Sequence, residues 1–185
     1  MQRGLISTLA SLALSCALIT VEASQVRSID LEQMTERAAR IFSGRCVATE
    51  VVFDAAVGSR VTVATFRVDR AVKGTPGRTV TIRMLGASTG DRMEGDAAGV
   101  PAFRVGEEVV LFLYGESALG LTAPVGLGQG RFEIVTDKQG RKLALNDLAN
   151  KNLVRAGRAD RAARFAEALD PTSLLDRVEK LVSGR

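Results

Sequence analysis

One stretch, residues 60–85, constrains the fold of this chain more than any other part of the sequence. Its second half alternates apolar and polar residues, and the apolar positions are Val80, Ile82 and Met84. That alternation is typical of a strand buried on one face. The first half alternates in the same way from Ala64 to Val68. Between the halves, residues 75–78 are Thr-Pro-Gly-Arg, a sequence that favours a type II turn. The stretch therefore predicts two strands joined by a turn.

The start of the first strand leaves two interpretations open, because Val61 and Val63 are out of phase with Ala64 and Phe66. Either both faces of the strand are partly covered, or a bulge near Val63-Ala64 shifts the phase and bends the strand. A long, bent strand covered on both faces suits a small closed barrel better than a flat sheet.

The remaining pattern predicts a mainly β domain with flanking helices. A helix begins near Ser28 or Asp30, and its apolar stripe is Leu31, Met34, Ala38, Ile41 and Phe42. Ser43-Gly44 is expected to end this helix. Further strands are expected at 45–53, 109–114, 131–135 and 141–145. The glycines of 124–130 precede a strand rather than a helix, so they indicate close backbone approach and not a phosphate loop.

The C-terminal part of the sequence changes character. Residues 150–169 carry arginines at three-residue spacing among alanines: Arg155, Arg158, Arg161 and Arg164. A solvated helix face is the expected structure, and an acidic partner is the alternative. Asp170-Pro171 then caps a last helix whose apolar stripe either packs on the barrel or offers a docking surface.

The N-terminal segment has the features of a cleaved export signal. Arg3 is followed by an apolar run, and Val21 and Ala23 are the small residues that a signal peptidase recognises. The expected domains are therefore a signal peptide over 1–23, a barrel with its N-terminal helix over 28–145, and a helical tail over 146–185. This predicts a secreted or periplasmic protein that begins at Ser24. A lipid anchor at Cys16 is the less favoured alternative, because apolar residues continue past that cysteine.

Composition excludes several classes of site. The chain has no histidine, which removes Ser-His and Cys-His nucleophile pairs and histidine-rich zinc sites. Its net charge of +4 and lack of tryptophan argue against a nucleic-acid surface. Cys46 would be the single mature cysteine and is expected to be a small core residue. We therefore expect no cofactor, no metal and no catalytic residues.

A polar, glycine-rich segment over 86–104 is the expected partner-binding loop. Its candidate contact residues are Met93, Glu94, Asp96, Val100 and Phe103. The apolar members of this set could also fix the loop to the body of the domain. An enzyme is the less favoured class: Glu107 and Glu108 would point to opposite faces of a strand, and a mobile loop is a poor catalytic platform.

Three segments together resemble the netrin-like modules of secreted proteins, which include the tissue inhibitors of metalloproteinases. They are residues 38–47, 66–82 and 105–113, and the resemblance extends over about residues 32–135. It is strongest to uncharacterised exported bacterial proteins of that shape. The resemblance implies a five-stranded barrel of the oligonucleotide/oligosaccharide-binding (OB) type. The inhibitors place an N-terminal cysteine on the protease zinc, but here the expected mature start is Ser24, so that mechanism does not carry over.

The function expected from the sequence is therefore that of an exported, non-enzymatic binding module for an extracytoplasmic protein. A secreted protease is one candidate partner, which would make the chain inhibitor-like. The alternative is a domain that binds or acts on carbohydrate or another surface ligand.

Overall fold

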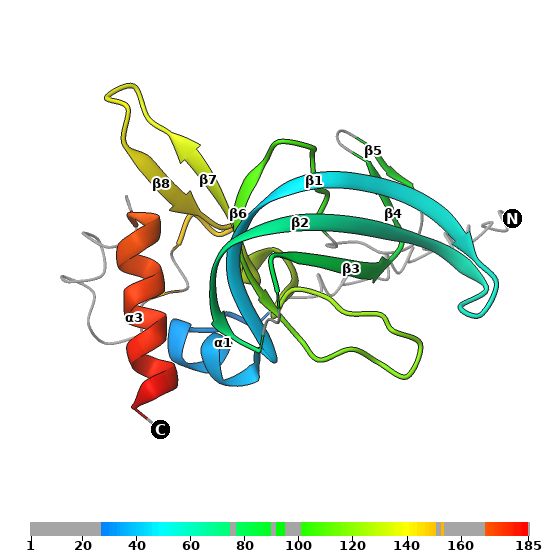
Figure 1. Ribbon diagram of the computed structural model, residues 1–185, viewed down its shortest axis with the longest axis horizontal. Coiled ribbons are helices and arrows are strands. Elements are labelled where there is room, and N and C mark those ends of the chain that lie inside the picture. The colour runs from blue at the N-terminus through cyan, green and yellow to red at the C-terminus, as the bar shows by residue number, and fades with distance from the viewer. Residues whose placement is uncertain are drawn as a thin grey trace, which may run out of the picture.

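The computed structural model describes residues 27–74, 77–89, 92–94, 101–150, 153 and 169–184 (Figure 1). Its main sheet has six antiparallel strands in the order β3-β2-β1-β6-β7-β8. The strands are β1 (Arg40–Asp54), β2 (Ser59–Lys73), β3 (Thr79–Leu85), β6 (Glu108–Leu113), β7 (Arg131–Thr136) and β8 (Lys142–Leu145). The short strands β4 (Ala87–Thr89) and β5 (Arg92–Glu94) form a separate pair.

Among the described residues, the α-helices α1 (Leu31–Arg37) and α3 (Pro171–Ser183) and the 3₁₀ turn η1 (Leu127–Gly130) accompany these strands. The prediction of a mainly β fold with flanking helices is thus confirmed. No helix within the described ranges is long and apolar enough to cross a membrane.

The prediction of a closed five-stranded barrel is wrong in its strand number and its closure. The sheet has six strands, and no ladder among the described residues joins its edge strands β3 and β8. Other segments meet each edge instead. The backbone N–H of Thr122 donates to Arg83 O of β3 at 2.8 Å, and Ala144 of β8 donates to Leu169 O at 2.7 Å. These contacts supply edge backbone groups with partners without closing the sheet.

The central strands β1 and β6 separate two hydrophobic cores. Ile41, Val110 and Phe112 belong to one core with α1 and α3. Phe42, Leu111 and Leu113 belong to the other core with β2 and β3. Consecutive residues point to opposite faces of a strand, so both faces of β1 and β6 are covered. The strand predicted at 109–114 is thus β6, which is buried on both faces up to Leu113, while Tyr114 lies beyond its end and is exposed.

The two faces also explain why the first helix was predicted too long. It ends at Arg37, and Ile41 and Phe42 lie in β1. Their burial on opposite faces of a strand gives the same apolar pair that a helical stripe would give. The start of the helix was predicted well, because the Asp30 side chain caps it by accepting from Gln33 N at 2.8 Å.

The open question about the start of β2 is settled in favour of coverage on both faces. Val61 and Thr62 are both fully buried, and pairing with β3 runs without interruption from Val61 to Arg67. The alternative interpretation, a bulge near Val63-Ala64, is therefore not the one that the structure shows. Register shifts between β1 and β2 occur elsewhere, and one of them falls between Cys46 and Ala48.

The last helix packs within the same chain. Asp170 caps α3 by accepting from Ser173 N at 2.8 Å, as the sequence predicts. Leu174, Leu175 and Val178 are buried in the core that α1 shares. In Figure 1, α3 lies beside α1, at the end of the sheet far from the β1–β2 tip. The predicted arginine-rich segment, 155–164, lies outside the described residues.

Two of the turns that join strands of the main sheet can be compared with the sequence. Gly77 has a φ of 82°, the value that a type II turn requires at this position, while Thr75 and Pro76 lie outside the described residues. The hairpin between β7 and β8 turns at Asp137–Gly140, where Asp137 N donates to Arg141 O at 2.9 Å. The glycines before β7 do permit close approach: a Cβ on Gly130 would lie 2.5 Å from Val125 O.

Candidate functional site

A tight turn before β6 positions the charged residues of the site. Gly106 has a φ of 92°, a conformation that favours glycine. Its N–H donates to Cys46 O, and Cys46 N donates to Glu107 O, both at 2.8 Å. These two bonds hold the turn against β1, and they fix where Glu107 and Glu108 project.

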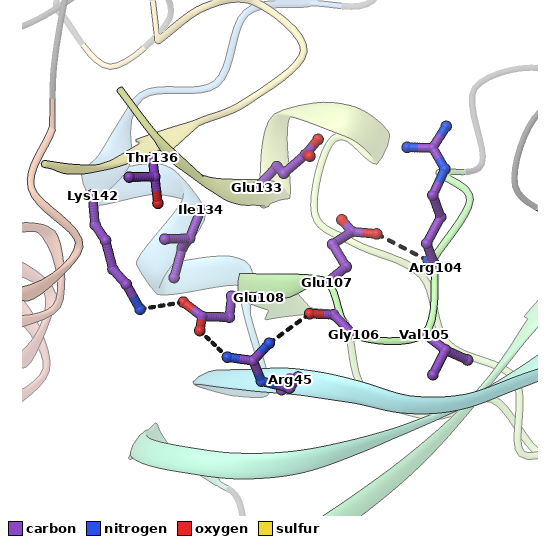
Figure 2. Close-up of a pocket in the computed structure, with 10 residues that line it drawn as sticks. All are labelled: Arg45, Arg104, Val105, Gly106, Glu107, Glu108, Glu133, Ile134, Thr136 and Lys142. Atoms are coloured by element: carbon purple, nitrogen blue, oxygen red, sulfur yellow. Dashed lines mark hydrogen bonds and ion pairs between the residues drawn. The ribbon is translucent and has the colours of Figure 1, made fainter. Parts of the chain in front are cut away.

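Beside this turn the surface forms a hollow of about 370 Å³ between β1, β6, β7 and β8 (Figure 2). Its lining is mostly charged or polar. The lining residues are Arg45, Arg104, Val105, Gly106, Glu107, Glu108, Glu133, Ile134, Thr136 and Lys142. The volume lies near the lower end of the range for small-molecule pockets in proteins.

One wall of the hollow is built around Glu108. Arg45 forms an ion pair with one carboxylate oxygen, and Lys142 Nζ donates to the other at 2.6 Å. Arg45 is held further by donating to Gly106 O at 2.8 Å. In Figure 2, Arg45 and Lys142 approach Glu108 from different strands. The Lys142 hydrogen bond, with attraction from Arg45 and Arg67, lowers the pKa of Glu108.

The opposite wall is built around a buried ion pair. The side chains of Glu107 and Arg131 are only 7% and 10% exposed, and their charged groups are in contact. The second Glu107 oxygen accepts from Arg104 N at 3.0 Å. Arg131 also lies 3.7 Å from Glu133, and its guanidinium stands 5.5 Å from the centre of the Phe103 ring. This distance is within the range of a cation–π contact.

Burial determines the direction of the pKa shifts of two carboxyl groups, one in this wall and one near it. It raises the pKa of Glu107, even though the positive charge of Arg131 opposes the shift. Asp147 behaves similarly. Although that residue is exposed as a whole, its carboxyl lies against Gly128, and this partial burial raises its pKa. Attraction from Arg131 and repulsion from Glu133 also act on Asp147.

Glu107 is expected to make stability fall as pH rises. Because its pKa is raised in the folded chain, the folded state binds more protons than the unfolded state between the ordinary value of 4.5 and the raised value. Stability is therefore lost as pH increases through that window. We expect the unfolding free energy of Glu107→Gln, minus that of the unchanged protein, to increase with pH in urea denaturation series. Glu108 and Asp137, whose lowered pKa values act in the opposite direction, are present in both proteins. A pH-independent difference would contradict the expectation.

The predicted partner loop is only partly described. Phe103 is fully buried and packs edge-on against Phe66, with ring centres 5.0 Å apart. It fixes the end of the loop to the core and is not available for a partner in this structure. Met93 and Glu94 lie in β5, whose side chains are outside the description, as are Asp96 and Val100 altogether. Their role in partner binding stays a prediction.

Glu107 and Glu108 contact different groups, as their adjacent positions suggest, yet both line the same hollow. The sequence pattern does not indicate this, because Glu107 belongs to the turn before β6 and not to the strand. Cys46 is fully buried, as predicted. Burial, followed by repulsion from Glu107, raises the pKa of its thiol, which disfavours the reactive thiolate. Within the described ranges, no three acidic or cysteine side chains are grouped to hold a metal ion.

Comparisons with known proteins add no relative to this description. No family model matches the chain, and neither the curated proteins nor the solved structures contain a match.

Proposed function

We propose that this chain is an exported, non-enzymatic binding module that engages a protein partner through the charged hollow. The observation that carries the proposal is that the charged side chains of the hollow hold one another in place. Arg45, Glu108 and Lys142 come from three strands and fix one another by ion pairs. Side chains that are already ordered lose less entropy when a partner binds, which favours recognition by such a surface.

The bonding of the two glutamates supports binding over catalysis. Both oxygens of Glu108 accept from Arg45 and Lys142, and both oxygens of Glu107 accept from Arg131 and Arg104 N. A general base needs a carboxylate oxygen within reach of a substrate proton. The lowered pKa of Glu108 also makes it a weak base.

The export part of the proposal rests on the sequence, which has the features of a cleaved signal over residues 1–23. The netrin-like resemblance favours a binding role, but the open sheet of six strands has neither the strand number nor the closure of the barrel that it implies. Export through a signal over 1–23 would bring the hollow to an extracytoplasmic partner, and a secreted protease is one candidate. An inhibitor-like role would then act through the hollow and not through an N-terminal cysteine.

A capture experiment tests the binding role of the hollow. Lys142→Met removes one charge from the basic wall, and Lys138→Met removes the same charge from the exposed β7–β8 turn outside it. We expect tagged protein and Lys138→Met to retain the same partner from the extracytoplasmic fraction, and Lys142→Met to lose most of it. Charge-assisted contacts contribute about 1.5–3 kcal/mol, so a loss of about tenfold or more in retention is expected. Equal retention by all three proteins would refute the assignment.

A further inference from the structure

The two walls of the hollow carry opposite charge excesses. On the basic side, Arg67, Arg45 and Glu108 are direct neighbours across β2, β1 and β6. Two arginines placed directly opposite each other on neighbouring strands repel, and this costs stability unless another charge offsets it. Lys142 adds a third cation on the other side of Glu108. Two cations of the lining, Arg45 and Lys142, therefore contact one carboxylate, and Arg67 lies one strand further away.

These cations remain accessible to a ligand. The side chains of Arg67, Arg45 and Lys142 are 60%, 40% and 56% exposed. Asp69 lies 3.5 Å from Arg67 and neutralises part of the excess. With Asp69 counted, the basic side still carries one more positive than negative charge.

The other side of the hollow has an excess of negative charge, and we call it the acidic side. Its lining carboxylates are Glu107 and Glu133, and both lie next to Arg131, which does not itself line the hollow. Arg104 also lines this part of the hollow. In Figure 2 its guanidinium projects away from Lys142 and Arg45. Among the lining residues of this side, two carboxylates therefore face one cation, Arg104. Glu133 is the accessible one, with a side chain 41% exposed.

From this arrangement we propose that the hollow binds a dipolar polypeptide segment. Its carboxylate side chain would lie against Lys142 and Arg45, and its basic side chain against Glu133. This inference rests on the proposed function and adds the chemical class of the partner segment. A uniform polyanion fits less well, because one end of it would meet Glu133 and the buried Glu107.

Crossed substitutions in protein and peptide test the proposal. The probes are blocked, fluorescently labelled peptides with one aspartate and one lysine separated by about three to five uncharged residues, in both orders. Matched probes replace the aspartate with asparagine or the lysine with norleucine. Binding is measured by fluorescence anisotropy to the full chain, to Lys142→Met, to Glu133→Gln and to Lys138→Met.

We expect each protein substitution to weaken only those peptides that carry the complementary charge, which we call coupling. Lys142→Met should weaken the dipolar peptide about tenfold and leave the asparagine peptide unchanged, because one charge-assisted contact is lost. Glu133→Gln should weaken the dipolar peptide and leave the norleucine peptide unchanged. Lys138→Met should have no effect. Circular dichroism confirms that each variant is folded, and the conservative Lys142→Arg should retain the coupling.

Two outcomes would overturn the inference. One is an all-acidic peptide or a single-stranded oligonucleotide that binds as tightly as the dipolar peptide. The other is the absence of either coupling in folded variants. If the capture of a partner still depends on Lys142 in that case, the binding role stands and only the dipolar assignment fails. If capture is also unchanged, both fail.

Discussion

Replacing Arg131 with methionine is expected to lower the free energy of unfolding by about 3–5 kcal/mol. The substitution leaves Glu107, whose side chain is 7% exposed, without its opposite charge. It also removes the cation next to the Phe103 ring. With Arg131 removed, only the hydrogen bond from Arg104 N still offsets the lost hydration of this buried carboxylate. Urea denaturation at neutral pH provides the measurement.

A second substitution distinguishes the lost charge pair from a packing defect. In the double variant Glu107→Gln with Arg131→Met, no charge is left buried, and glutamine can still accept from Arg104 N. We expect the double variant to recover most of the lost stability. If Arg131→Met alone costs less than about 1 kcal/mol, the pair is not buried in the way described.

Replacing Phe103 with alanine is expected to cost a similar amount, about 3–5 kcal/mol. Its ring is fully buried between Phe66 and Arg131. Removing it leaves a cavity in the core that β2 and β3 share, and it frees the end of the predicted loop. Thermal unfolding followed by circular dichroism measures the loss of stability.

Phe53 is the matched control, because its side chain is 69% exposed at the end of β1. Phe53→Ala removes the same group from the surface, so its effect on stability is expected to stay within about 0.5 kcal/mol. Equal effects of the two substitutions would contradict the assignment of Phe103 to the core. A stable Phe103→Ala variant that lost partner capture would instead restore this residue to the binding loop.

The sequence predicts strands well where one face is buried and the other is wet. Val80, Ile82 and Met84 are buried in β3, while Thr79, Thr81 and Leu85 on the same strand are exposed. Here the period of two has one physical cause and therefore one interpretation. The sequence predicts secondary structure poorly where both faces of a strand are covered. Ile41 and Phe42 face different cores, and their spacing fits a helix and a strand equally well.

The closure of the sheet and the hollow depend on contacts that no local pattern contains. Arg45, Glu108 and Lys142 are distant in sequence and meet only through the pairing of β1 with β6 and the turn of β7 into β8. Without the register of those strands, the three residues are indistinguishable from ordinary surface charges. The sequence did single out Glu107 and Glu108, but it could not show that burial and Arg131 would give them different roles.

The position of β1 and β6 between the two hydrophobic cores has a consequence for how the molecule unfolds. Each of these strands contributes buried side chains to both cores, so separating either core from the sheet exposes apolar surface of the other. Neither core can therefore unfold while the other stays intact. The α-helical side and the β2–β3 side are therefore coupled into one cooperative unit, and the charged hollow at the start of β6 is supported by both.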